Sequence, residues 1–366
     1  MKKALFILLL AAATGCHKSD AVLGPEPEGD RVTVGFALGE VGASAKPAST
    51  RADVVEEPLA VGATVRVLAF QRAAGATSAD ITADKYVAEA TYVVEEVLAD
   101  DGVTKVRRLK ACNVNSATGA VDVANSSIPD EIRLRADKYD FYAFTPATAI
   151  ASPWKVSIAH GVDHASSCTE QVAVAPDLSG AVPVYTQTVD LNVLMRRCCR
   201  ISFAAERKSE TVSKITISSA KLSKMANTPA EATLCTALPL SATNPTDISL
   251  ASSIFSSVDG LQYKFAGETI VLPKREEEFN IEMTVQFNDS GTDKVLTGEV
   301  PAMAFDPGYQ YCFVLSLNGG ELALKLVIMN WEAEWSGDYG LGDWFYGSID
   351  LNTWTSSEGW DADLGA

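Results

Sequence analysis

The sequence predicts an all-β protein built from two tandem β-sandwich domains, and three observations predict it. Apolar and polar residues alternate along many short segments. Turn-forming residues separate those segments at intervals of about 8–15 residues, and no long amphipathic segment carries helix caps. With 366 residues, the chain is long enough for about two domains, each with its own hydrophobic core.

The first half of the chain contains three clear strand signals. Residues 31–38 alternate between apolar and polar side chains, and the small, proline-containing residues 39–50 predict a loop after them. Residues 64–70 are predicted to form another strand. Residues 86–98 are also compatible with a helix, but the β-branched residues in this segment favour a strand.

A longer strand is predicted over residues 189–205. Whether a residue has an odd or an even number (its parity) decides which face of the strand carries its side chain. Successive side chains of a strand point to opposite faces. Cys199 shares the parity of the apolar residues Leu191 and Phe203, so it is predicted to be buried. Cys198 falls on the face that carries arginines and is predicted to be exposed, and both cysteines are buried only if a bulge intervenes.

Two hairpins are predicted near the C-terminal end. Residues 281–287 and 295–300 are joined by an Asn-Asp-Ser-Gly turn, and residues 309–317 and 322–330 by an Asn-Gly-Gly turn. The strand signals divide the chain into an N-terminal sandwich over 31–205, a C-terminal sandwich over 206–335 and a Trp- and Gly-rich tail over 336–366.

The N-terminus has the pattern of a targeting segment. In residues 1–15, two lysines precede a run of about ten apolar residues, which is too short for a bilayer core that needs about 20. Small residues come directly before Cys16, so this cysteine is predicted to be lipidated and to begin the mature chain; an ordinary secretory signal is the alternative. The polar, proline-containing residues 16–30 predict a tether to a membrane that the protein does not span.

Six further cysteines follow Cys16. An even number in an exported protein permits disulfides without requiring them, and fifteen pairings are open. Their spacing gives neither a zinc ribbon nor a CxxC redox motif. They are Cys112, Cys168, Cys198, Cys199, Cys235 and Cys312.

Composition argues against a nucleic-acid partner and against an enzyme. The chain has 30 basic and 47 acidic residues, a formal net charge of −17, and only three histidines. His160, His164 and Cys168 have a spacing that a helix could gather around zinc. The glycine and serines between them make a poor helix, so we interpret the stretch as a loop with exposed histidines.

Two further motifs match catalytic or metal-binding patterns only formally. Residues 218–221 fit SxxK but lie in a strand-like segment without supporting motifs. Asp289 and Asp293 could contact calcium, but the chemistry of the turn explains them equally well. We therefore expect no cofactor, no metal and no reaction.

Four stretches of the chain form an ordered set of motifs. After the N-terminal targeting pattern comes Ser-Thr-Arg-Ala at 49–52, followed by Tyr-Asp-Phe-Tyr-Ala-Phe-Thr-Pro at 139–146. The mid-chain strand and the Pro-Gly-Tyr-Gln-Tyr sequence at 307–311 complete the set. Taken in order, these stretches resemble the fimbrillin family, the pilus and surface-lipoprotein subunits of Bacteroidota, although cysteines replace its usual small residues at 198–199. The resemblance covers about residues 1–335.

The resemblance implies two transthyretin-like β-sandwich domains and a role in assembly and adhesion. It implies a surface-exposed lipoprotein of the cell outer membrane, held through Cys16, or a location in a fimbrium. In the family, an arginine-specific protease can cut after the first strand, here after Arg51, and a strand from a neighbouring subunit fills the opened groove. The implied partners are other fimbrial subunits, including further copies of this chain, and host or bacterial surface proteins or glycans.

The tail contains a second alternating segment. Ile349, Leu351 and Trp354 are candidates for a donor strand or contact surface. Trp344 and Trp360, flanked by glycine and acidic residues, are candidates for contact with a ligand such as a sugar ring. The alternative function is therefore a glycan-binding surface lipoprotein of a polysaccharide-uptake system.

Overall fold

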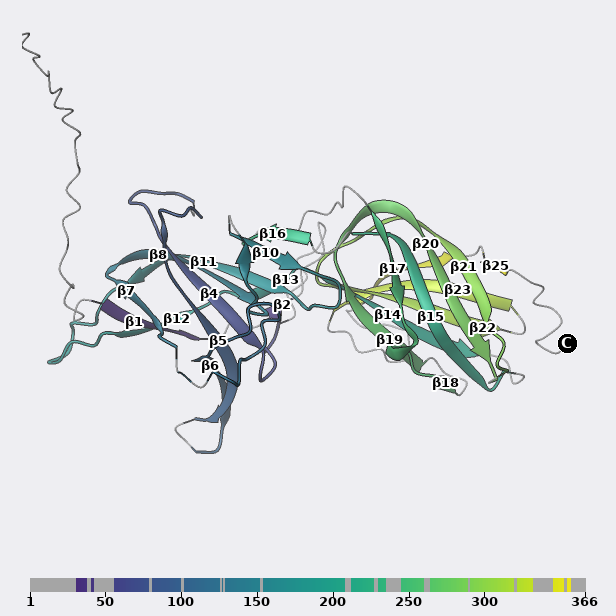
Figure 1. The fold of residues 1–366 in the computed structure, drawn as a ribbon, viewed down its shortest axis with the longest axis horizontal. Coiled ribbons are helices and arrows are strands. Elements are labelled where there is room, and N and C mark those ends of the chain that lie inside the picture. The colour runs from purple at the N-terminus through teal and green to yellow at the C-terminus, as the bar shows by residue number, and fades with distance from the viewer. Residues whose placement is uncertain are drawn as a thin grey trace, which may run out of the picture.

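The computed structural model is almost entirely β. It describes residues 31–37, 41–42, 56–78, 81–99, 102–125, 127, 129–151, 154–207, 212–226, 230–234, 245–259, 264–288, 290–318, 321–331, 345–351 and 354–356. Within these ranges one 3-10 turn, Ser252–Ile254, interrupts the strands, so the predicted all-β fold is confirmed. None of the described residues form a helix long and apolar enough to cross a membrane. Figure 1 shows two lobes arranged along the long axis of the molecule.

The first lobe is a sandwich of two sheets. An eight-stranded sheet runs in the order β3-β2-β13-β11-β8-β4-β5-β6, and the three-stranded sheet β12-β1-β7 faces it. The core between them includes Val34 and Ile132 from the small sheet and Val67 and Phe141 from the large one. The strands are β1 (Arg31–Ala37), β2 (Val41–Gly42), β3 (Glu56–Glu57), β4 (Thr64–Gln71), β5 (Tyr86–Leu98), β6 (Lys105–Ala111), β7 (Ile132–Arg135), β8 (Asp137–Thr145), β9 (Ile150–Ala151), β10 (Lys155–Ile158), β11 (Ala165–Val174), β12 (Thr186–Asp190) and β13 (Leu194–Arg196).

The second lobe is also a sandwich. Its sheets run β19-β14-β22-β23-β24 and β17-β15-β20-β21-β25, and the core between them includes Phe203, Phe279 and Phe313. Both predicted hairpins are present, as β20–β21 and β22–β23. The strands are β14 (Cys199–Arg207), β15 (Lys214–Met225), β16 (Ala230–Thr233), β17 (Thr246–Leu250), β18 (Val258–Asp259), β19 (Lys264–Val271), β20 (Lys274–Phe287), β21 (Lys294–Phe305), β22 (Tyr309–Asn318), β23 (Glu321–Asn330), β24 (Phe345–Leu351) and β25 (Trp354–Ser356).

The predicted exposure of Cys198 is wrong. The segment 189–205 is not one strand: it contains the end of β12, all of β13 and most of β14, with irregular backbone between them. The break resets the parity, so Cys198 is buried beside Trp331 while Cys199 is buried in the second core, as predicted. We place the boundary between the lobes between Leu194, which belongs to the first core, and Cys199.

The two lobes are joined by strand pairing and a shared apolar cluster. β16, although it follows β15 of the second lobe in sequence, pairs antiparallel with β10 of the first. The shared cluster contains Phe70 and Tyr142 from the first lobe together with Leu234 and Leu272 from later in the chain. Because a buried cluster and backbone hydrogen bonds act together, the joint resists independent motion of the lobes.

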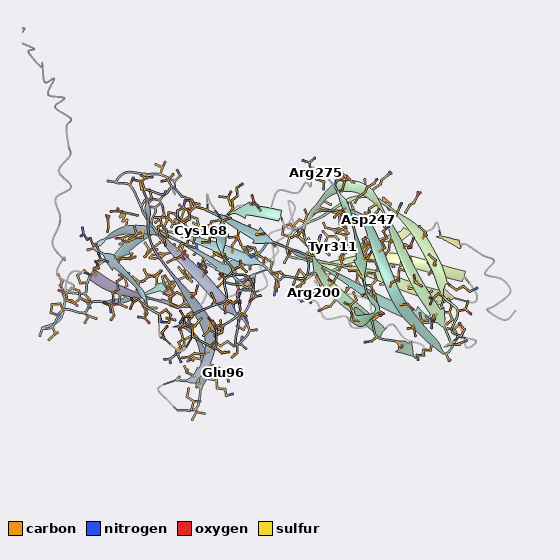
Figure 2. All side chains as sticks on the ribbon, in the orientation of Figure 1. Glu96, Cys168, Arg200, Asp247, Arg275 and Tyr311 are labelled. Atoms are coloured by element: carbon orange, nitrogen blue, oxygen red, sulfur yellow. The ribbon has the colours of Figure 1, made fainter. Side chains whose placement is uncertain are left out.

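A tryptophan held between two arginines reinforces this joint. The guanidinium carbons of Arg196 and Arg200 each lie 4.6 Å from a ring centroid of Trp331, whose side chain is fully buried. Arg196 also pairs with Asp163 at 3.3 Å. Figure 2 shows Arg200 at the end of the second lobe that faces the first. Cation–π contacts in such a desolvated setting are stronger than exposed ones.

Lys274 is a buried lysine at the bulged end of the β20–β21 hairpin. Its ammonium group donates hydrogen bonds of 2.9 Å to the carbonyl oxygens of Arg275, Glu277 and Met303, and it lies over the ring of Phe279. Burial lowers the pKa of Lys274 from 10.5 to about 8. The group therefore releases its proton at lower pH in the folded protein than in the unfolded chain.

This lysine gives a predicted pH dependence. Between about pH 8 and 10.5 the unfolded chain binds more protons at Lys274 than the native state does, so this residue makes the free energy of unfolding rise with pH. Relative to Lys274→Met, the wild type should gain roughly 1 kcal/mol per pH unit in this window. Urea titrations of both proteins measure the difference, and Lys138→Met controls for removing an exposed lysine. A constant difference between wild type and Lys274→Met from pH 8 to 10 would contradict the expectation.

Candidate functional site

The first strand, β1, lies in the middle of its sheet rather than at an edge. It pairs in parallel with β12 over residues 33–37 and antiparallel with β7 over residues 31–34. Both partners come from much later in the sequence, so β1 is inserted between segments that do not pair with each other directly. In Figure 1, β1 lies at the end of the first lobe that is remote from the second.

The buried face of β1 fills a slot in the first core. We use this word for the space between β7 and β12 that Val32, Val34 and Phe36 occupy. Val32 and Val34 are fully buried and Phe36 is 6% exposed. The ring of Phe36 packs edge-on against Tyr92 at 5.5 Å and Phe141 at 5.2 Å between centroids. At about 1.5–3 kcal/mol for each buried side chain, the three contribute roughly 5–9 kcal/mol.

Loss of β1 would open this slot. The backbone groups of β7 and β12 that now pair with β1 would have no partner, and the pockets of its three apolar side chains would face water. Unpaired strand edges beside apolar pockets favour the entry of another strand with the same alternation. The arrangement is therefore chemically suited to strand replacement.

Arg51 lies in sequence between β2 and β3, which stand at one edge of the large sheet. β2 and β3 lie on either side of it in sequence and pair antiparallel, with Val41 opposite Glu57. Arg51 itself is outside the described residues, as are Cys16, Trp344 and Trp360. A cut after Arg51 would leave β1 and β2 without a covalent link to β3.

The tail forms edge strands on its own lobe. β24 pairs antiparallel with β23, placing Ile349 opposite Leu326 and Leu351 opposite Leu324. β25 pairs antiparallel with β21, placing Trp354 opposite Gly298. The strand predicted from alternation is present, and within the described structure its partners belong to the same chain. Because each of these strands has a single neighbour among the described residues, these two strands are held less firmly than β1.

Both histidines lie outside the strands, as predicted, but neither is exposed, so the predicted exposure is wrong. His160 is partly buried; its Nδ1 accepts a 3.1 Å hydrogen bond from the backbone N–H of Leu272, and its Nε2 lies 3.0 Å from the carbonyl oxygen of Ala226. His164 is 4% exposed, and burial lowers its pKa to about 4. Among the described residues, no three His, Cys, Asp or Glu side chains gather around a possible metal position.

The remaining sequence motifs have structural roles where they are described. Lys221 lies in β15, as expected, and forms an ion pair of 2.8 Å with Asp247. Asp293 accepts a 2.7 Å hydrogen bond from Gln286, while Asp289 is outside the described residues.

The described cysteines form no disulfide with one another, and most are buried. Desolvation raises the pKa of Cys198 and Cys199, and raises that of Cys312 to about 12, so these thiols stay protonated and unreactive at neutral pH. Cys235 lies outside the described residues. The described cysteines are Cys112, Cys168, Cys198, Cys199 and Cys312.

The fold and the position of β1 together define a class of protein: a two-sandwich β protein whose first strand is the central strand of its sheet. Residues 31–338 match the fimbrillin-like family, and the chain belongs to it. The family resemblance seen in the sequence is thereby confirmed, and the match favours the fimbrial interpretation over the polysaccharide-uptake alternative.

Solved structures share the fold at low sequence identity. One, from Bacteroides fragilis, is of a protein with a proposed role in cell adhesion; it is 18% identical, aligns over 85% of this chain and 100% of its own, and gives a TM-score of 0.53. Another, from Bacteroides ovatus and also with a proposed role in cell adhesion, is 13% identical, aligns over 83% and 99%, and gives 0.50. A search of curated proteins gives no match.

Proposed function

We propose that this protein is a surface subunit of a fimbria, structural or accessory, that acts in assembly and adhesion and catalyses no reaction. Membership of the fimbrillin-like family and the proposed adhesion role of the solved relatives support this function. The observation that carries the proposal is β1, a central strand whose apolar face fills a slot in the core. Such a strand can be exchanged for the strand of a neighbouring subunit.

The assembly role can be tested on material sheared from the cell surface. If the chain is a fimbrial subunit, antibodies to it should detect a ladder of assemblies that resists denaturant at room temperature and collapses to one band on heating. Fibres carrying this chain should be visible by immunogold labelling. A chain found only as a monomer in the sheared fraction, with no labelled fibres, would contradict the proposal.

The lipid anchor is the second part of the proposal. The residues before Cys16 support lipidation of its thiol, and acyl chains buried in the outer membrane would hold the protein at the surface. Cys16→Ala should move the protein from the membrane fraction to the soluble fraction. Labelled fatty acid should enter the wild type and not the variant. If the variant remains membrane-bound and the wild type incorporates no label, the lipid anchor does not exist.

A further inference from the structure

A cavity of about 650 Å³ opens on the first lobe, on the side of β4 and β5 away from the first core. Val65, Val67 and Ala69 of β4 point into that core, so Arg66, between them, faces the opposite side and lines the cavity. A volume of this size is typical of pockets that hold small ligands. Neither the slot of β1 nor the tail contributes a lining residue.

Two aromatic rings, supported by a third, build one wall of the cavity. Phe70 is fully buried and contacts Trp154 edge-on at 5.0 Å and Tyr86 edge-on at 5.8 Å. The Tyr86 and Trp154 rings are inclined at 32° with their centroids 4.9 Å apart, and both residues line the cavity. Phe70 therefore fixes two partly exposed rings as a rigid apolar wall.

The backbone of Trp154 is held in an unfavourable conformation. Its φ of 55° lies in the left-handed region, which bulky side chains rarely adopt. The carbonyl oxygen of Trp154 accepts a 3.1 Å hydrogen bond from the N–H of Leu234, and the next residue, Lys155, begins the pairing of β10 with β16. The strand contributed by the later half of the chain thus holds the tryptophan in place, at a cost of about 1–3 kcal/mol. Residues held in this way concentrate at ligand sites.

The polar part of the cavity is an ion pair with no net charge. Arg66 donates from Nη1 to Oε1 of Glu89 at 2.8 Å, and the side chains are 12% and 35% exposed. Thr82 and Ser116 line the cavity as well. Burial and the Glu89 carboxylate raise the pKa of Tyr86, so its hydroxyl remains a donor at neutral pH.

This combination selects a class of ligand. A pyranose ring has an apolar face that packs on aromatic rings and a rim of hydroxyl groups that needs both donors and acceptors. The cavity offers an aromatic wall, a guanidinium and a carboxylate. Because Arg66 and Glu89 neutralise each other, neither an anionic nor a cationic ligand is favoured.

We propose that this cavity binds a neutral hexose unit of a glycan, with the ring packed on Tyr86 and Trp154 and its hydroxyls bound by Arg66 and Glu89. This inference goes beyond the proposed function, because a single chain binds the sugar whether or not it polymerises. It gives the first lobe an adhesive site of its own, separate from any surface used for assembly.

The test uses the full mature chain as a monomer. It is applied to an array of immobilised neutral oligosaccharides, built from hexoses, N-acetylhexosamines and fucose, and of their sialylated counterparts. Wild type should retain at least one neutral series in preference to its sialylated form. Calorimetry with the best neutral oligosaccharide should then show at least a tenfold loss of affinity in Glu89→Gln and in Trp154→Phe. Both substitutions remove little volume, and circular dichroism and thermal melting check that the fold is intact.

Tyr185→Ala is the matched control, because it removes an exposed aromatic side chain that does not line the cavity. It should bind as the wild type does. Absence of any signal on the neutral array, a preference for sialylated glycans, or affinity that survives both cavity substitutions would overturn the proposal. A folded variant that loses sugar binding but still assembles would show that the two functions are separate.

Discussion

Phe36→Ala should lower the free energy of unfolding by about 3–5 kcal/mol, the usual cost of removing a buried phenylalanine. The ring packs against Tyr92 and Phe141 in the first core. No neighbouring side chain can therefore fill the space left by the missing ring unless a strand moves. Urea denaturation followed by tryptophan fluorescence measures the loss.

The matched control is Val103→Ala, because Val103 is 81% exposed and its substitution should change the stability by less than about 0.5 kcal/mol. The Phe36→Ala protein should also take up an added synthetic peptide of residues 31–38 faster than the wild type does. A loss below about 1 kcal/mol would mean that β1 is not anchored by its apolar face.

Treatment with an arginine-specific protease should convert the monomer into oligomers that resist denaturation and increase with protein concentration. Cleavage after Arg51 would detach the segment that carries β1 and open the slot between β7 and β12. The tail is the candidate donor, because β24 and β25 are edge strands that give up one neighbour each on leaving. The oligomers should be absent in Arg51→Ala and in a chain that ends at Gly347.

The outcomes of this experiment separate three arrangements. Oligomers that form in the chain ending at Gly347 would exclude strand donation by the tail. Oligomers that form in Arg51→Ala would show that cleavage at this position is not required. A chain that is cut and remains monomeric at high concentration would identify a terminal or anchor subunit rather than a repeating one.

Alternation of side chains predicted the strands well where one face is buried and the other is solvated. β1 and β5 follow the expected pattern, and β5 is a strand as its β-branched residues indicated. β4 is also a strand, but Leu68 and Phe70 on its second face are buried as well. In β22 the alternation is present in the sequence, but Gln310 and Cys312 on the second face are buried as well. A local pattern cannot reveal that other parts of the chain cover the second face.

The errors have the same cause. Cys198 is buried because the strand breaks before β14, and its partner Trp331 is more than a hundred residues away. His160 was expected to be exposed because its neighbours in sequence form a loop, yet Ala226 and Leu272 contact it from the second half of the chain. Burial that depends on such distant partners is invisible in a single sequence.

For the candidate site, the sequence predicted that residues 31–38 form a strand, but it did not predict the position of that strand in the sheet. The apolar face of residues 31–38 was evident, whereas the parallel pairing with β12 was not, because nothing in a strand specifies partners so far along the chain. No pattern in the sequence predicted the proposed sugar-binding cavity either. Tyr86 and Trp154 are separated by 68 positions and meet only because β4, β5 and β10 converge.

The position of β1 also has a mechanical consequence. A subunit held at its N-terminus and pulled at its far end transmits the tension along β1. Because β1 has hydrogen-bonded neighbours on both sides and lies between them, a pull along its axis loads both ladders in shear, so many bonds must fail together. An edge hairpin would instead open one bond at a time. A strand inserted into the same slot by a neighbouring subunit would inherit this geometry, which suits a fibre that must survive flow.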